Sequence, residues 1–186
     1  MPDRINTKEY WDMLWKSPKR HVERYSMQWV LWRIMEFEPK SVLDIGCGNG
    51  LLLFRIKQLL PACEVFGVDL SETAIARMRN QYGLEGQVMD AYDVDQLPRT
   101  FDFIVANHLL EHLYRDREFV KKCQVLLNPG GMFYAAVPNN ISGPEETEEH
   151  VRKYDNFSLK ALLSGVFGNA NTTLVGKHLI GWSQKV

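Results

Sequence analysis

Three glycines alternate with other residues directly after a short apolar run, in a stretch that could hold a ligand. This stretch, residues 41–51, reads SVLDIGCGNGL and contains Gly46, Gly48 and Gly50. Glycine adopts positive φ readily and lets a ligand approach where a Cβ atom would clash. Asp44 lies just before the turn, and a carboxylate at that place repels a pyrophosphate but attracts a cation. The pattern therefore predicts a site for a ligand that carries positive charge.

The residues on either side of the glycines predict how the turn is held. Residues 42–45 form a largely apolar run typical of a buried parallel strand, and residues 51–60 indicate a helix that stops at Pro61. A strand, a glycine turn and a helix N-terminus together make a nucleotide-binding corner. The dinucleotide fingerprint is Gly-x-Gly-x-x-Gly, but here the third glycine comes one residue early. A nicotinamide-dependent oxidoreductase is therefore a less favoured class, and an ordinary strand-to-helix turn is the non-functional alternative.

Polar side chains follow the next three predicted strands, which are residues 65–68, 87–89 and 101–106. Asp69, Asp90 and Asn107 each come directly after one of these runs. Ligands of open α/β sheets bind outside the carboxyl ends of the strands, so we expect these side chains to lie together. Asp69 comes roughly twenty residues after the turn, where an acidic residue binds ribose hydroxyls. The alternative for Asp69 is a strand end, and for Asp90 a turn or cap residue.

Histidine and acidic side chains after the fourth predicted strand are candidates for proton transfer. His112, beside Glu111, is the best candidate for a general base; His108, His150 and Tyr154 are weaker ones. Histidine titrates near neutral pH, which suits a base, but it often serves structure instead. The alternative that Glu111 and His112 cap the following helix or line the pocket stays open.

The glycine stretch resembles motif I of the class I S-adenosylmethionine (SAM)-dependent methyltransferases, Asp/Glu-x-Gly-x-Gly-x-Gly. Asp44, Gly46, Gly48 and Gly50 match it position by position. Residues 68–71, VDLS, resemble the second motif of that family, and residues 111–139 are similar to the subgroup that modifies quinones, sugars and other small metabolites. The resemblance, to the methyltransferase type 11–12-like subgroup, covers about residues 41–139.

This resemblance implies an α/β, Rossmann-like, doubly wound fold: a seven-stranded, mostly parallel sheet with the last strand antiparallel and helices on both faces. It implies one domain over residues 1–186, with an N-terminal helical cap over 1–39 and a Rossmann-like core over 40–186. The implied reaction transfers a methyl group from SAM to an O, N or C atom of an acceptor and gives S-adenosylhomocysteine (SAH). Within the cofactor site the resemblance places Asp44, Gly46, Cys47 and Gly48 toward the methionine, Asp69 and Leu70 at the ribose, Asp90 and Ala91 at the adenine, and Asn107 near the sulfonium.

The aromatic-rich segment near the N-terminus has two interpretations. Tyr10, Trp11 and Trp15 precede a helix predicted over residues 19–37. Large aromatic side chains usually pack on neighbouring elements. In many small methyltransferases of this class the N-terminal segment covers the SAM pocket instead, and on that interpretation we expect Tyr10 in the cofactor site.

Two variants of the function remain in view. Metal-dependent small-RNA and quinone O-methyltransferases carry Glu-x-x-Glu-His where this chain has His108, Glu111 and His112, with His150 further on. Two imidazoles and a carboxylate could bind a divalent transition metal, but His108 replaces the first glutamate, and we therefore expect no metal site. The other variant is a SAM-binding partner subunit without catalysis, since a fold alone does not fix function.

Composition and net charge indicate which kinds of partner and which location to expect for the chain. The net charge of −1 over 186 residues gives no broad electrostatic footprint for nucleic acid, so we expect a small-molecule acceptor; a homodimer fits as well. Three widely spaced cysteines argue against a disulfide framework and for a reducing compartment, and the polar N-terminus contains no secretory signal. No apolar run could span a bilayer, and we expect a cytoplasmic location.

Overall fold

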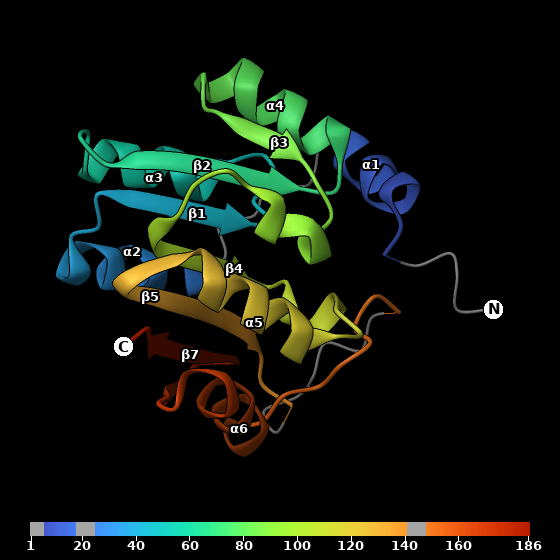
Figure 1. The fold of residues 1–186 in the computed structure, drawn as a ribbon. Coiled ribbons are helices and arrows are strands. Elements are labelled where there is room, and N and C mark those ends of the chain that lie inside the picture. The colour runs from blue at the N-terminus through green and yellow to red at the C-terminus, as the bar shows by residue number, and fades with distance from the viewer. Residues whose placement is uncertain (1–5, 18–24, 141–147) are drawn as a thin grey trace.

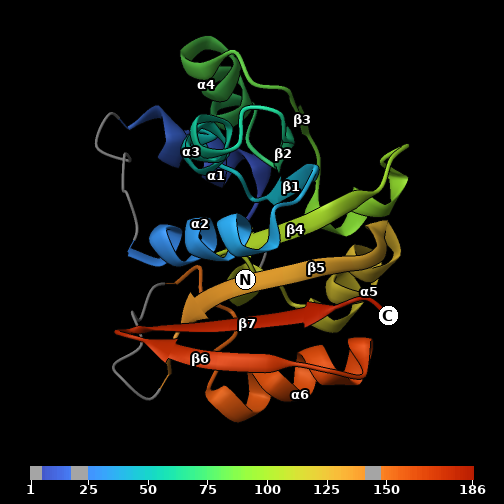
Figure 2. The ribbon, with the colours of Figure 1, turned by 90° about the vertical axis from the view of Figure 1, so that its left-hand side faces the viewer.

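The computed structural model describes residues 6–17, 25–140 and 148–186. One mixed sheet of seven strands runs through it, in the order β3-β2-β1-β4-β5-β7-β6 (Figures 1 and 2). The strands are β1 (Ser41–Ile45), β2 (Glu64–Asp69), β3 (Gly86–Val88), β4 (Phe101–Asn107), β5 (Leu127–Pro138), β6 (Asn171–Val175) and β7 (His178–Gln184). Strand β1 pairs in parallel with β2 and β4, whereas β7 is antiparallel to both of its neighbours. The predicted fold class is confirmed.

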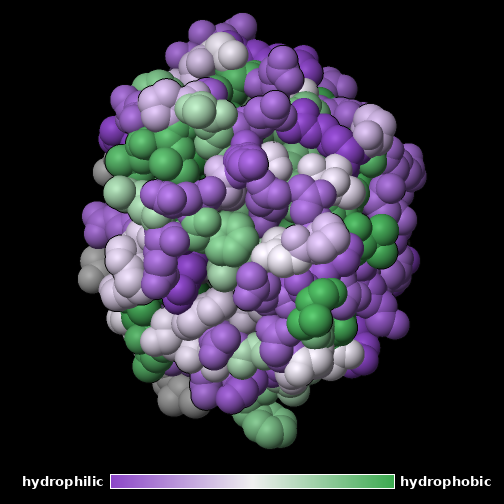
Figure 3. Space-filling model, turned by 60° about the vertical axis from the view of Figure 1, so that its left-hand side comes forward, coloured by the Kyte–Doolittle hydropathy of each residue, from purple (hydrophilic) through white to green (hydrophobic). Residues whose placement is uncertain are grey.

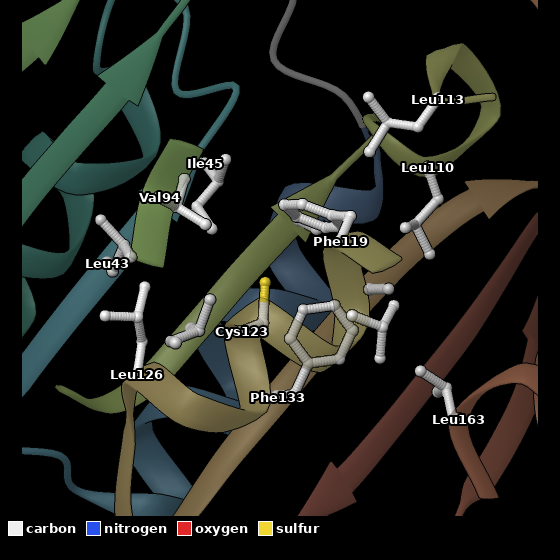
Figure 4. Packing of buried hydrophobic residues seen from close by; sticks show 14 of the residues in the cluster. Leu43, Ile45, Val94, Leu110, Leu113, Phe119, Cys123, Leu126, Phe133 and Leu163 are labelled. Atoms are coloured by element: carbon white, nitrogen blue, oxygen red, sulfur yellow. The ribbon is translucent and has the colours of Figure 1, made fainter. Parts of the chain in front are cut away.

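Helices cover both faces of this sheet. They are α1 (Lys8–Lys16), α2 (Tyr25–Phe37), α3 (Leu51–Leu59), α4 (Glu72–Tyr82), α5 (Asp116–Leu126) and α6 (Asn156–Phe167), with short 3-10 helices η1 (Ala91–Gln96) and η2 (Leu110–His112). Buried side chains of α2, α3 and α4 share one apolar cluster with the sheet, and those of η1, α5 and α6 share another. Figure 4 shows part of the second cluster, in which Phe119 and Cys123 of α5 lie beside Phe133 of β5.

Local sequence explains where the helices next to the site begin and end. The Ser71 hydroxyl accepts a hydrogen bond from the Ala74 amide and so caps α4, which ends at Gly83 with φ of 63°. Helix α3 begins after Gly50, whose φ is 77°. The α4 cap follows β2 directly, and Gly50 precedes α3 directly, so both helix N-termini lie at the edge of the sheet where β1 and β2 end.

Strand β5 begins earlier than its sequence indicated. Residues 128–131, NPGG, predicted a break before a strand over 132–137, but the strand spans Leu127–Pro138. Leu127 pairs with Phe101 before the register shifts between Phe101 and Phe103. The Gly130 amide also donates to the Lys185 carbonyl at 2.9 Å. Tertiary pairing at the sheet edge thus overrides the local turn signal.

The predicted N-terminal cap divides into two parts with different surroundings. Helix α2 packs on the sheet, where Val30 and Ile34 are fully buried. Helix α1 has no buried residue and contacts α4. The start of the helix predicted over 19–37 lies outside the described residues. Helix α2 is thus part of the core, whereas α1 lies on its surface.

All three cysteines are buried and free. Burial raises the pKa of the Cys63 thiol to about 11, and it raises the pKa values of Cys47 and Cys123 well above their usual range. In the described part of the chain, every helix is too short or too polar to cross a membrane. On the side that Figure 3 shows, hydrophilic residues cover most of the surface, with hydrophobic residues in separate small patches.

Candidate functional site

A cavity of about 330 Å³ opens at the carboxyl ends of β1, β2 and β4. Its size lies within the range of small-molecule sites. Ten predicted site residues line it: Asp44, Gly46, Cys47, Gly48, Asp69, Leu70, Asp90, Ala91, Asn107 and His112. The structure thus brings these residues together around one cavity, as the sequence predicted.

The glycine turn brings the backbone close to the cavity and to its neighbours. The amides of Gly46 and Cys47 both donate to the Val68 carbonyl, at 2.7 and 3.0 Å, which ties the turn to β2. At Gly48, with φ of 55°, an added Cβ would collide with the ring of Trp15. Only glycine therefore allows α1 to lie this close to the turn.

Three buried side-chain oxygens of residues that line the cavity have no hydrogen-bond partner among the described residues. They are Oδ1 of Asn6, Oδ1 of Asp44, in β1, and Oδ1 of Asn107, the last residue of β4. Asp44 is 3 % exposed. Burial and, next, the charge of Asp69 raise the pKa of the Asp44 carboxyl well above its usual range. A buried acceptor without a donor is costly, and a cationic donor in the cavity would offset that cost.

The other two aspartates hold the loops at the strand ends. Asp69 accepts the Gly48 amide at 2.8 Å on Oδ2 and the Ser71 amide at 2.9 Å on Oδ1. Each carboxylate oxygen can accept more than one hydrogen bond, so ribose hydroxyls could share the same group. Asp90 caps η1 by accepting the Tyr92 amide at 2.8 Å. Asp90 therefore has the cap role that the sequence left open, and it lines the cavity as well.

Helix α1 lies against the open side of this cavity and contributes the tryptophans Trp11 and Trp15 to its wall. Tyr10 is the exception among the predicted site residues, because it is not among the described residues that line the cavity. Its ring instead meets Trp11 edge to face, and its hydroxyl donates to Glu149. Successive helix positions point in different directions, and the sequence alone did not determine which aromatic residue faces the cavity.

Asp12 fixes α1 to the N-terminus of α4. One carboxylate oxygen, Oδ1, accepts the Ser71 hydroxyl at 2.5 Å and the Thr73 amide at 3.0 Å. Burial alone would raise the pKa of Asp12, but these hydrogen bonds and the nearby Lys8 ammonium lower it below the usual value. The helix is therefore held at its centre by a charged group.

We expect Asp12→Ala to release α1 from the core. Hydrogen bonds to a charged group contribute about 1.5–3 kcal/mol, so amide exchange in residues 8–16 should accelerate by about tenfold or more, as hydrogen-exchange mass spectrometry would measure. Lys8→Ala is the matched control, because Lys8 makes only an exposed ion pair with Glu72 and a longer contact with Asp12. Equal exchange rates in the two variants would contradict this role of Asp12.

Histidines gather beyond the end of β4. His108 has a φ of 57°, and its Nδ1 donates a hydrogen bond to Glu111 Oε1 at 3.1 Å. Both side chains are buried. His112 lies beside His150, with ring centroids 5.0 Å apart. One ligand atom each of Glu111, His112 and His150 lies within 4.8 Å of the others. The sequence motif and the later histidine thus do meet in space.

The charges of this group follow from burial and contact. Burial acts to raise the pKa of Glu111, but the hydrogen bond with His108 and the charges of His108 and His112 outweigh it and lower the pKa. Burial lowers the pKa of His112, although Glu111 opposes that shift. At neutral pH, therefore, Glu111 is a carboxylate and His112 is a neutral imidazole, the form that can accept a proton.

The strand order and the glycine-rich, carboxylate-edged cavity define a Rossmann-like nucleotide-binding domain. The family profile described as "Methyltransferase domain" matches residues 43–133. The matched residues, just under half of the chain, are similar to a methyltransferase domain, as the resemblance to the class I SAM-dependent methyltransferases implied.

Curated relatives share this similarity, and a solved structure shares the fold. The chain is 37% identical over 109 residues to a protein named ubiquinone biosynthesis O-methyltransferase from Mesorhizobium japonicum, covering 55% of this chain and 43% of that protein. It is 33% identical over 153 residues to the protein of the same name from Idiomarina loihiensis, covering 78% of this chain and 52% of the relative. The chain thus spans about half the length of these curated relatives. The crystal structure of the plantazolicin methyltransferase BpumL, in complex with a triazolic desmethyl analog and SAH, shares the fold with a TM-score of 0.73 at 16% identity, covering 95% and 90% of the two chains.

Several residues of the cavity wall were not predicted from the sequence. Met27 of α2, Met89 after β3, and Leu109 and Tyr114 around η2 also line it. Apolar residues in such positions carry no motif, because any side chain of suitable size can fill them. Their positions close to the ends of predicted elements were the one signal in the sequence that could have indicated a place in the cavity wall.

Proposed function

We propose that this chain binds SAM and transfers its methyl group to an O, N or C atom of a small-molecule acceptor, giving SAH. The observation that carries this proposal is that two buried acceptors on the wall of one cavity, Asp44 Oδ1 and Asn107 Oδ1, find no hydrogen-bond partner in the described part of the chain. SAM bears an ammonium and a sulfonium, and both would gain from a carboxylate in a poorly solvated site. A pyrophosphate would be repelled by the same group.

The remaining cavity residues fit the parts of SAM in order along the sheet edge. Asp44, Gly46, Cys47 and Gly48 would hold the methionine portion, Asp69 and Leu70 the ribose, and Asp90 and Ala91 the adenine. The resemblance and the place of each of these residues on the cavity wall support this assignment.

The chemistry needs little beyond positioning. SAM supplies a methyl group already activated by the positive sulfur. The chain must hold the acceptor atom in line with the methyl–sulfur bond, and alignment of this kind can lower a barrier by about 7–11 kcal/mol. His112, neutral and on the cavity wall, would take a proton from an acceptor that must lose one.

Isothermal titration calorimetry with SAM, SAH and NAD tests the proposed ligand. We expect SAM and SAH to bind with one site per chain and NAD to give no heat. Binding of NAD in preference to SAM would overturn the proposal in favour of the oxidoreductase class. Binding of SAM without transfer to any acceptor in a radiolabelled methyl screen would support the non-catalytic partner subunit instead.

A metal-assisted reaction is the second candidate, favoured by the group of Glu111, His112 and His150. The two imidazoles of this group suit zinc or iron better than magnesium. The three ligand atoms all lie within 4.8 Å of one another, and two ligands of a tetrahedral zinc ion lie roughly 3.4 Å apart, so little movement would be needed to bind one. Equilibrium dialysis with Zn²⁺, followed by metal analysis, tests this: wild type should retain one ion and His150→Ala none, whereas equal retention would exclude the candidate.

The acceptor class, assembly and location remain proposals. Relatives named for ubiquinone biosynthesis support a small molecule over nucleic acid, and the net charge of −1 agrees. We further propose a cytoplasmic location from the three buried, free cysteines. We also propose a homodimer, which sedimentation would test.

A further inference from the structure

The N-terminal segment converges on one side chain at the far end of the cavity, His112. The Asn6 amide Nδ2 donates to the His112 carbonyl at 3.2 Å and to the Glu149 carbonyl at 3.0 Å. The Tyr10 hydroxyl donates to the Glu149 carboxylate. Trp11 meets the His112 ring edge to face, with centroids 5.0 Å apart. Segments more than a hundred residues apart in sequence thus surround this imidazole.

The contact between His112 and Glu149 determines where the proton of the ring sits. His112 Nδ1 lies 3.0 Å from the Glu149 carbonyl oxygen. A carbonyl oxygen can only accept a hydrogen bond, so Nδ1 carries the proton and Nε2 of the neutral ring carries the lone pair. Imidazole in water prefers the other tautomer, with the proton on Nε2. The backbone carbonyl of Glu149 therefore imposes an uncommon tautomer on a residue of the cavity wall.

Side chains of the N-terminal segment help to place that carbonyl, which also accepts a hydrogen bond from the Val151 amide at 3.1 Å. Tyr10 holds the Glu149 carboxylate, and Asn6 holds the Glu149 carbonyl itself. Asp12 and Trp15, on the same helix as Tyr10, contact the α4 cap and the glycine turn. Helix α1 thus bridges the two ends of the cavity.

We propose that Tyr10 and Glu149 are positioning residues that keep His112 in the Nδ1–H tautomer, with Nε2 available to the acceptor. Only the role of Nε2 toward a methyl acceptor rests on the proposed function. The tautomer itself is a property of the protein alone. The base itself is His112. Tyr10 and Glu149 act through it, and they do so only while α1 lies on the core.

The tautomer can be read directly from long-range ¹H–¹⁵N correlation spectra of the histidine rings at pH 8, with His112→Ala to assign the signals. In wild type we expect the protonated-nitrogen shift on Nδ1 of His112. In Tyr10→Phe and Glu149→Ala we expect the ring to shift toward the Nε2–H tautomer. Glu149→Gln keeps an acceptor for the Tyr10 hydroxyl and should restore the wild-type pattern. Lys8→Ala, on the exposed side of α1, is the control.

Measurements of the melting temperature and of SAH affinity distinguish a positioning role of Tyr10 and Glu149 from a purely structural one. Melting temperatures within a few degrees of wild type would show that the variants fold. SAH affinity should stay within about threefold of wild type, or about 0.7 kcal/mol. With an acceptor in hand, Tyr10→Phe should lower kcat by about tenfold and leave KM for SAM unchanged, a smaller loss than the 10²–10⁴ of a deleted base.

Two results would overturn the proposal. One is an Nε2–H tautomer of His112 in the wild-type protein, and the other is a wild-type tautomer in both Tyr10→Phe and Glu149→Ala. A wild-type protein that binds neither SAM nor SAH would instead reject the proposed function, and it would leave the tautomer result readable on its own.

Discussion

Asp44→Asn is expected to weaken SAM and SAH binding by about 100-fold and, at the same time, to raise the melting temperature of the unliganded protein. Removing one partner of a buried charge pair costs about 2–5 kcal/mol, and 2.8 kcal/mol corresponds to 100-fold in affinity. Without ligand, however, the carboxylate is buried, one oxygen has no partner among the described residues, and Asp69 repels it. The asparagine side chain has the same shape and no charge, so the folded state no longer bears that cost.

The pH dependence of the same group follows with a definite sign. The pKa of Asp44 in the unliganded fold is raised, so its charge destabilises that fold at pH values above the unfolded pKa, and the stability gain of Asp44→Asn should shrink toward acid pH. A bound cation favours the carboxylate and lowers this pKa. Binding therefore releases a proton between the two pKa values, and SAM affinity should fall as the pH is lowered through the raised one.

Calorimetry in two buffers of different ionisation enthalpy measures that proton release, which Asp44→Asn should abolish. Asp93→Asn, an exposed aspartate of η1, is the control and should change neither affinity nor stability. If Asp44→Asn bound SAM as tightly as wild type, the carboxylate-edged cavity would not be the donor site.

Gly50→Ala is expected to lower the free energy of unfolding by about 2–5 kcal/mol. Gly50 has φ of 77°, where a residue with a Cβ atom pays about 1–2 kcal/mol. An added methyl group would also collide with the Cγ of Met78 on α4, and overpacking of this kind costs about 1–3 kcal/mol more. Urea unfolding of the two proteins measures the sum.

Gly83→Ala separates the two contributions. Gly83 has φ of 63° as the last-turn cap of α4, but no atom lies within 4 Å of its added Cβ. This variant should lose only the backbone part, about 1–2 kcal/mol, and the difference between the variants is the crowding against Met78. In a double-mutant cycle, Gly50→Ala should cost less in a Met78→Ala background than in wild type, and the coupling energy should match part of that difference. Equal losses at the two glycines would show that Met78 moves aside without cost.

The central strands and the cavity edge could be predicted because their signals are local. Val42 and Leu43 are apolar, fully buried and followed by the glycine turn, so strand, turn and helix were visible within a few residues. Asp69 and Asp90 were found for the same reason, as polar residues directly after apolar runs. In a parallel sheet, position at a strand end fixes position in space.

The contacts of α1 could not be predicted, because they join residues far apart in the chain. Nothing near Tyr10 indicates that its hydroxyl reaches Glu149, or that Trp15 rather than Tyr10 faces the glycine turn. The left-handed backbone of His108 was hidden as well, since it depends on the Ala136 carbonyl accepting the His108 amide and on the Glu111 side chain. Such features depend on tertiary contacts that override local preference.

The burial of all three native thiols has a practical consequence. Their raised pKa values leave almost no thiolate at neutral pH, and thiolate is the form that reacts with maleimides. One cysteine introduced at Met13, which is 60% exposed on α1, would therefore be labelled selectively in an otherwise unaltered chain. A spin label or dye at that point would report directly, in solution, how often the helix leaves the rim of the cavity.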